Sequence, residues 1–105
     1  MQRDREKESL LLDYYGDLLT RHQYEILDEY FNEDLSMNEI ADNLQISKSA
    51  VQDLIKRTLV QLNAYEETLK MIDTGRKLND ILDEMKRQDD QQILAFADRI
   101  EKIMK

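Results

Sequence analysis

Apolar residues recur every three or four positions through nearly the whole chain, which is the spacing of one face of an α-helix. The first run of this kind predicts a helix over residues 6–19. Its candidate buried positions are Leu11, Tyr14, Tyr15, Leu18 and Leu19. Gly16 interrupts the run at a cost of roughly 1 kcal/mol relative to Ala, so we expect this glycine to permit a close contact with another helix.

A second helix is predicted at about residues 21–31, because Thr20 and Gln23 have the spacing of a capping box. In this motif each of the two side chains satisfies a free backbone amide of the first helical turn. The apolar face of the second helix consists of Tyr24, Leu27, Tyr30 and Phe31. We expect this face to pack against the first helix and against the segment that follows.

The segment 36–59 predicts two helices joined by a sharp turn. Ser36 and Glu39 form another capping box, so a helix begins there. The apolar face of this short helix consists of Ile40, Ala41 and Leu44. Gln45-Ile46-Ser47 is the expected break, in which the isoleucine would tuck under the corner as an apolar plug and the serine would cap the next helix.

A longer helix is predicted from Lys48 onwards. It buries the positions Val51, Ile55 and Leu59, which follow one another at i, i+4 and i+8. This is the layout of a helix-turn-helix, whose second helix, the recognition helix, places its N-terminal half in the major groove of DNA. The candidate DNA-binding residues are the cap and the polar face of this helix: Ser47, Lys48, Ser49, Gln52, Lys56 and Arg57.

The apolar stripe of the recognition helix extends well beyond the turn region. It continues through Leu62, Tyr65, Leu69 and Ile72. The first breaker is Thr74-Gly75, so we expect Gly75 to be the C′ cap of a helix of about 25 residues. The expected domains are therefore a helix-turn-helix domain over residues 1–74 and a helical appendage over residues 75–105.

The appendage predicts two further helices, separated by the charged residues 87–90. Their apolar positions are Leu78, Ile81, Leu82 and Met85 in the first helix, and Ile93, Leu94, Phe96, Ala97, Ile100, Ile103 and Met104 in the second. The extra turns of the recognition helix need a partner for their stripe. The appendage either folds back as an antiparallel hairpin or pairs with a second copy of the chain, and we expect both, which makes the protein a homodimer.

Composition agrees with an all-α fold. The 105 residues include no proline and two glycines, which is few helix breakers for this length. The chain has no cysteine, which excludes disulfides and thiolate metal sites and fits a reducing compartment. The N-terminal stretch has charges of both signs before three leucines, and it fits neither a signal peptide nor a membrane span. We expect a cytoplasmic protein with no membrane insertion.

The formal net charge of −8 is unfavourable for binding DNA, because Lys and Arg contacts to phosphates supply much of the affinity. The distribution of charge is more favourable than the sum. Residues 22–47 contain seven acids and no Lys or Arg, whereas residues 48–64 contain three bases and one acid. The recognition helix is thus a basic strip on an acidic body, which predicts weak and salt-sensitive binding. The alternative is that Lys48, Lys56 and Arg57 are simply a solvated helix face.

Residues for catalysis or cofactor binding do not converge in this sequence. The single histidine, His22, lies in the first turn of a helix beside a capping threonine, where a surface role is expected. The carboxylate pairs at i, i+4, such as Asp80 with Glu84, lack the histidine ligands that accompany them in metal-binding bundles. We therefore expect a protein that is not an enzyme and that takes no cofactor or metal.

Residues 13–71 resemble a known family. The most specific elements are YYGDLLTRHQ, DLSMNEIA, the IS-x-x-AV turn and IKRT. Together they are similar to the YlxM-like helix-turn-helix proteins of bacteria, whose gene lies beside that of the signal recognition particle GTPase. The resemblance implies a fold similar to DNA-binding region 4 of sigma factors, and a role in or regulation of the signal recognition particle pathway. Where family members often carry Arg-Gln, this chain has Lys48-Ser49, which removes two bidentate base readers.

Two function classes follow from these patterns. The first is a dimeric DNA-binding regulator, in which Gln52 and Ser49 approach base edges while Lys48, Lys56 and Arg57 hold phosphates. The second is a protein–protein adaptor that meets a basic component of the signal recognition particle through its acidic body and binds no DNA. A diverged regulator that retains the fold without affinity for DNA is a third alternative.

Overall fold

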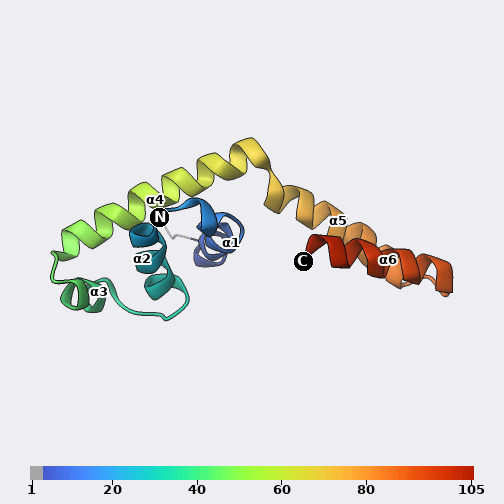
Figure 1. The fold of residues 1–105 in the computed structure, drawn as a ribbon, viewed down its shortest axis with the longest axis horizontal. Helices are drawn as coiled ribbons and strands as arrows, with labels where there is room; N and C mark the ends of the chain where they lie inside the picture. Colours follow the sequence, from blue (N-terminus) through green and yellow to red (C-terminus); the bar gives the residue numbers. More distant parts are fainter. Residues whose placement is uncertain (1–3) are drawn as a thin grey trace. The chain divides into compact units, whose positions relative to one another are not determined.

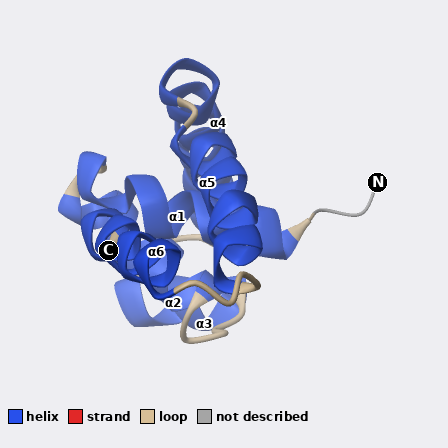
Figure 2. Cartoon of the chain, turned by 90° about the vertical axis from the view of Figure 1, so that its right-hand side faces the viewer, coloured by secondary structure: helices blue, strands red, loops and turns tan. Residues whose placement is uncertain are grey.

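The computed structural model describes residues 4–105, so the first three residues of the expected N-terminal domain lie outside the described part of the chain. The described residues form helices and no strand (Figure 1, Figure 2). The elements are α1 (Arg5–Tyr15), the 3₁₀ turn η1 (Gly16–Leu18), α2 (Arg21–Phe31), α3 (Met37–Leu44), α4 (Lys48–Leu69), α5 (Met71–Lys86) and α6 (Gln91–Met104). The expected all-α fold with a helix-turn-helix, a long recognition helix and a C-terminal helical hairpin is confirmed.

The chain divides into two compact units, which we call unit 1, ending at Lys70, and unit 2, Met71–Lys105. In unit 1, helices α1, α2 and α3 all pack against α4, the longest helix of the unit (Figure 1). The buried apolar core of unit 1 consists of Leu11, Leu12, Tyr15, Ile26, Leu27, Ile40, Ala41, Val51, Ile55, Leu59 and Leu62. Burial of this core fixes the direction in which the opposite side of α4 points.

Both expected capping boxes in unit 1 are confirmed. The amide of Glu39 donates to Ser36 Oγ at 3.1 Å, and the amide of Ser36 donates to the Glu39 carboxylate at 3.1 Å. Thr20 and Gln23 make the same reciprocal pair at the start of α2. These bonds satisfy amides that have no partner within the helix. The starts of α2 and α3 are therefore specified by four local side chains.

In residues 5–31, three side chains expected in the core are instead exposed, namely Tyr14, Leu18 and Tyr24. Leu44 and Leu69, which were expected on the apolar faces of the third and fourth helices, are exposed as well. The reason for Leu18 is that α1 ends at Tyr15 and the chain continues as a 3₁₀ turn. A 3₁₀ turn has three residues per turn, so side chains after Tyr15 leave the direction of the α-helical face. Leu12 and Ile26, which were not expected in the core, fill it.

Gly16 lies where α1 and α2 approach one another, as expected. A Cβ atom added there would lie 2.8 Å from Cε2 of the Tyr24 ring and 3.0 Å from Cδ2. The first of these distances is shorter than real carbon contacts allow, so the ring has to move if the side chain grows. The glycine backbone is helical, with φ −58° and ψ −33°. Gly16 therefore leaves room for the Tyr24 ring, and it is not needed for an unusual backbone conformation.

Replacing Gly16 with alanine is expected to lower the free energy of unfolding by about 1 kcal/mol, because overpacking outweighs the gain in helix propensity. Urea denaturation followed by circular dichroism measures the change. In a Tyr24→Ala background the obstructing ring is absent, so the same substitution is expected to stabilise the protein. A stabilising Gly16→Ala in the presence of Tyr24 would show that the ring yields without cost.

The end of α4 was predicted wrongly. The helix ends at Leu69, and Lys70 adopts a left-handed conformation with φ 55° and ψ 32° while its amide donates to Glu66 O. Gly75, the expected C′ cap, lies inside α5 instead. A glycine costs only about 1 kcal/mol within a helix, which the packing of α5 offsets. The break between the two units thus occurs at Lys70, five residues before the predicted cap, and lysine is a residue type that seldom adopts positive φ.

Unit 2 is an antiparallel hairpin of α5 and α6, which lie side by side (Figure 1). Asp90 caps α6 by accepting from the amides of Gln92 and Ile93. An ion pair between Lys86 and Glu101 links the two helices, and the hydrogen bond to Glu101 raises the pKa of the Lys86 ammonium above its ordinary value. No helix in residues 4–105 has the length and apolar character needed to cross a membrane.

Candidate nucleic-acid interface

The turn between α3 and α4 is closed by backbone and cap hydrogen bonds. Gln45 ends α3 in a left-handed conformation, with φ 57° and ψ 43°, and the amide of Ile46 donates to Ala41 O at 3.1 Å. Ser47 Oγ then accepts from the amide of Ala50 at 3.0 Å, which confirms the expected cap. Together these bonds orient the first turn of α4 relative to α3.

Ile46 does not act as the expected apolar plug, because its side chain is exposed. Apolar side chains of the two helices close the corner instead. Ile40 and Ala41 of α3 and Val51 of α4 are buried at this junction. Their packing holds the two helices of the motif at a fixed angle.

All six candidate DNA-binding residues are exposed. They lie on the N-terminal half of α4 or on its cap, and the face behind them is buried through Val51, Ile55, Leu59 and Leu62. Because one side of the helix is buried in the core, only the other side of α4 is open within unit 1. The structure therefore presents the polar face of α4 outward, in the manner of a recognition helix.

The six residues do not form one continuous row. Gln52 and Lys56 border a cavity of about 350 Å³ beside α1, whose wall includes Glu8. Arg57 borders another cavity, of about 300 Å³, beside the start of α2, together with Thr20.

The centre of the outward face lies between these two flanks. A rotation of about 100° per residue places Ser49, Asp53 and Val60 there. The sequence interpretation did not include the central Asp53 or Val60, and Val60 is 68% exposed.

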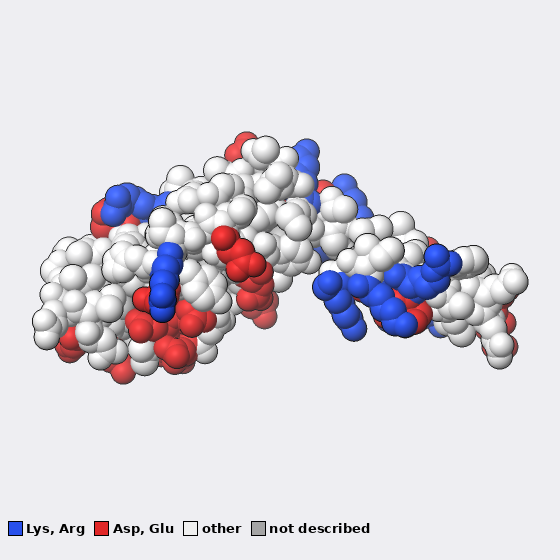
Figure 3. All heavy atoms as spheres, viewed as in Figure 1, with Lys and Arg blue, Asp and Glu red and all other residues white. Residues whose placement is uncertain are grey.

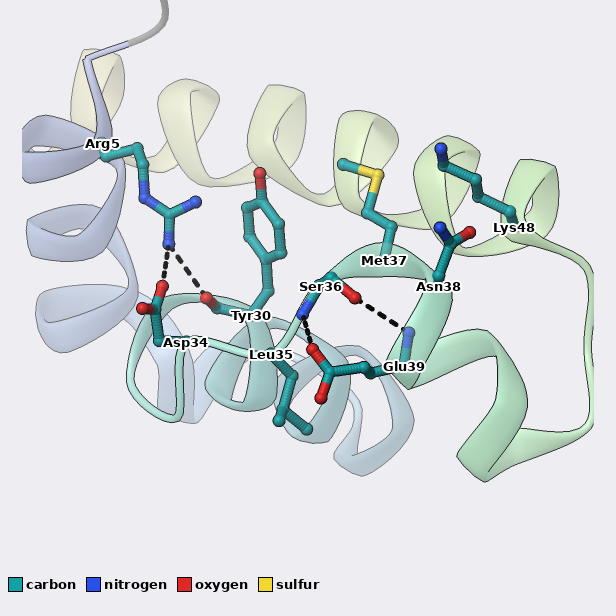
Figure 4. Close-up of a pocket in the computed structure, with 9 residues that line it drawn as sticks. All are labelled: Arg5, Tyr30, Asp34, Leu35, Ser36, Met37, Asn38, Glu39 and Lys48. Atoms are coloured by element: carbon teal, nitrogen blue, oxygen red, sulfur yellow. Dashed lines mark hydrogen bonds and ion pairs between the residues drawn. The ribbon is translucent and has the colours of Figure 1, made fainter.

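Lys48 lies on a third side, at a cavity of about 440 Å³ shared by all four helices of unit 1 (Figure 4). Arg5 of α1, Tyr30 of α2 and the first turn of α3 form its other walls. In Figure 4 the Tyr30 ring stands between Arg5 and Met37, while Lys48 lies at the opposite end. This cavity adjoins the start of the recognition helix.

Arg5 was not recognised from the sequence, and its contacts show a structural role. Its Nη2 donates to Tyr30 O at 3.0 Å and lies 3.6 Å from a carboxylate oxygen of Asp34. Its guanidinium carbon also lies 4.5 Å from the centre of the Tyr30 ring, within the range of a cation–π contact. Arg5 thus ties the start of α1 to the end of α2, across 25 positions of sequence.

The sequence of the whole motif matches a known family model. Residues 2–103 match the family described as "Putative helix-turn-helix protein, YlxM / p13 like". The chain belongs to this family. The resemblance inferred from residues 13–71 is thereby confirmed, and it extends over nearly the full chain.

Relatives within the YlxM-like family are similar over different lengths. A protein of Clostridium perfringens is 51% identical over 63 residues, which cover 60% of this chain and 56% of that relative. A protein of Acetivibrio thermocellus is 52% identical over 64 residues, covering 61% of this chain and 55% of the relative. A protein of Symbiobacterium thermophilum is 37% identical over 97 residues, covering 92% and 91% of the two chains.

Charges on the recognition helix of this YlxM-like protein partly cancel. Arg57 Nε lies 3.0 Å from an Asp53 carboxylate oxygen, one helical turn away. Lys48 and Lys56 form no ion pair with any described residue. The N-terminal half of α4 therefore offers two ammonium groups without an ion-pair partner among the described residues, and one guanidinium whose charge is shared with a carboxylate. Exposed pairs of this kind contribute little to stability, so Arg57 can exchange Asp53 for another anion at small cost.

Proposed function

We propose that this protein is a regulatory DNA-binding protein that places the N-terminal half of α4 in the major groove of duplex DNA. The observation that carries the proposal is the position of α4. Its inner face is fully buried against α1, α2 and α3, and its outer face is polar and unobstructed within unit 1. Membership of a helix-turn-helix family supports the same conclusion.

Each candidate residue has a role that follows from its place on the helix. Ser49 would approach base edges from the centre of the outward face, and the longer side chain of Gln52 would reach them from the flank beside α1. Lys56 and Arg57 lie on the two flanks of α4, and Lys48 lies at its start on a third side; from these positions the three side chains would contact phosphates of the groove walls. The serine cap, Ser47, fixes the start of the helix through its bond to Ala50.

Electrostatics predict weak binding with little sequence specificity. The chain carries a net charge of −8, and Asp53 lies at the centre of the proposed contact face. Three phosphate contacts per copy give a slope of log K against log salt of about −2.7. Base readout rests on Gln52 and Ser49 without an arginine directed at guanine, so discrimination between sequences is small.

The testing experiment is fluorescence anisotropy of a random-sequence DNA duplex titrated with the protein across a salt series. The same titration is made with reconstituted signal recognition particle. We expect DNA binding that weakens steeply with salt, at the slope given above. An absence of DNA binding at low salt, combined with binding to the particle, would contradict the proposal and favour the second candidate function.

That second candidate is an acidic protein–protein adaptor of the signal recognition particle. The face of unit 1 seen in Figure 3 gathers acidic side chains below α4. Within the acidic segment 22–47, Glu33 and Asp42 are exposed and form no ion pair with a described residue. These two carboxylates are available to a basic partner. Glu29 is less suitable, because one of its carboxylate oxygens is buried.

Asp53→Asn is expected to tighten binding to duplex DNA by about fivefold at low salt, because removal of one close like charge is worth about 1 kcal/mol in water. The substitution also releases Arg57 from its ion pair. Fluorescence anisotropy with the random duplex measures the change. The matched control is Asp98→Asn in α6, which breaks the equivalent i, i+4 pair with Lys102 at similar exposure. Equal effects of the two substitutions would show that only total charge matters, and that α4 is not the contact.

A further inference from the structure

Unit 2 is too small to bury its own apolar surface. It comprises two helices in 35 residues, Met71–Lys105, and the residues buried on them are Ile72, Gly75, Leu82 and Ala97. Units below about 40 residues generally need a disulfide, a metal or association with another chain. The chain has no cysteine, and the described residues contain no cluster of metal ligands. Support for unit 2 must therefore come from an apolar surface outside the hairpin.

Seven apolar side chains of unit 2, which are exposed or only partly buried, lie on one face of the hairpin. On α5, Leu78, Ile81 and Met85 recur at i, i+3 and i+7, so they share one side of the helix. The corresponding side of α6 carries Ile93, Phe96, Ile100 and Ile103. We call these seven residues the open face. Ile81 and Phe96 are each 54% exposed, and Ile103 is 84% exposed.

The ion pair between the helices shows that the two rows belong to the same side. Lys86 follows Ile81 by five positions on α5, and Glu101 follows Phe96 by five positions on α6. On each helix, the charged side chain therefore points about 140° around the helix axis from the apolar one. Lys86 and Glu101 meet across the hairpin. They therefore close one edge of the α5–α6 contact, while Ile81 and Phe96 flank the other edge.

We propose that the open face is the surface through which two copies of this chain pair, with their α5–α6 hairpins forming a four-helix bundle. Two hairpins that each expose one apolar face along their length bury both faces when they meet, which is the packing of such bundles. A two-fold axis lets the same patch serve both copies. Soluble proteins rarely expose a continuous apolar patch of more than a few hundred Å² without such a partner.

Charge favours a second copy over a different partner. The borders of the open face carry both signs, with Glu84 beside the α5 row and Arg99 beside the α6 row. The Arg99 guanidinium also lies 5.8 Å from the centre of the Phe96 ring. A border of mixed sign complements itself under two-fold symmetry, whereas it repels in part any partner of a single sign. Nucleic acid and strongly charged proteins are thus poor occupants.

Sedimentation equilibrium of the full chain over a range of concentrations tests the proposal, independently of DNA binding. The native chain is expected to be a dimer. The double substitution Ile81→Glu with Phe96→Glu is expected to weaken dimerisation on the order of 100-fold or more, because it buries charges at the centre of the interface. The matched control is Leu18→Glu in unit 1, whose side chain is also 54% exposed. It is expected to leave the dimer intact.

Far-UV circular dichroism checks that the double variant keeps its helices. If it does not, Ile103→Glu serves in its place, because this residue lies near the end of α6 and its substitution leaves the contact between α5 and α6 unchanged. A native chain that stays monomeric at all concentrations overturns the proposal and leaves the open face to a different protein. A variant that keeps its helices and still dimerises also overturns it.

Discussion

Replacing both Lys56 and Arg57 with alanine is expected to weaken binding to random duplex DNA on the order of 100-fold at 50 mM salt and on the order of 10-fold at 200 mM salt. Both side chains are exposed on the recognition helix, one on each flank. Each contact to a phosphate releases about 0.9 counterion, so the slope of log K against log salt should fall from about −2.7 to about −0.9. The change is independent of DNA sequence, because phosphates carry no sequence information.

The control for this variant is Lys77→Ala with Lys102→Ala in unit 2. It changes the net charge by the same amount, and both lysines form exposed i, i+4 ion pairs, as Arg57 does. A loss of affinity in the control equal to that in the Lys56/Arg57 variant would mean that binding reflects total charge. Unchanged binding in the Lys56/Arg57 variant would refute the assignment of these two residues as phosphate contacts.

The helix starts were predictable from sequence because their causes are local. A capping box is formed by two residues three positions apart, and the bonds it makes in the structure are those that the motif implies. The same holds for Ser47, which caps α4 through an amide three residues later. Interactions within one helical turn depend little on the rest of the fold. These signals therefore located α2, α3 and α4 correctly.

The end of α4 was not predictable, because no local residue marks it. Lys70 adopts positive φ although lysine has no special preference for that conformation. Conversely, Gly75 carries the usual signal for a helix end and lies within α5. Where the chain divides depends on which apolar residues pack into each unit. This division depends on packing between residues that are distant in sequence, and local sequence signals such as a glycine do not predict it.

Side-chain burial was predicted well on α4 and poorly on α1 and α2. Val51, Ile55 and Leu59 are buried as their spacing indicates, because a helix packed on one side by three others has an unambiguous inner face. Tyr24 had the right spacing but is exposed, and Ile26 takes its place. An aromatic ring on a short helix can lie over the edge of the core. The helical period alone does not distinguish these two positions.

The candidate interface was predicted as a list of residues, without its geometry. The sequence interpretation placed Lys48, Lys56 and Arg57 on the outer face of α4; all three are exposed, but Lys48 lies at the start of the helix on a third side. The cavities beside each one depend on α1, α2 and α3, which are distant in sequence. Asp53 was counted as a single acid among bases, and the structure places it one turn from Arg57 as an ion-pair partner. Because Asp53 pairs with Arg57, we expect the replacement of Asp53 to raise the affinity for DNA. The presence of an acid in the sequence did not by itself predict this effect.

Ile55→Ala is expected to lower the free energy of unfolding by about 3 to 4 kcal/mol, because the side chain is completely buried and its loss leaves a cavity. Ile55 lies at the middle of the inner face of α4. The cavity would open in the core of unit 1, where the surrounding helices are fixed by their own contacts and relax little. Thermal and urea denaturation followed by circular dichroism measure the change.

Val60→Ala on the same helix is the matched control, since it removes a branched apolar side chain that is 68% exposed. Its effect on stability is expected to lie within about 0.5 kcal/mol, and the replacement raises helix propensity. A small effect of Ile55→Ala would contradict the packing of α4 described above. At temperatures where the Ile55 variant remains folded, its DNA affinity should match that of the native chain, because the outward face is unchanged. Residues on the buried side of α4 are thus expected to determine the stability of the fold, and residues on its exposed side are expected to determine DNA binding.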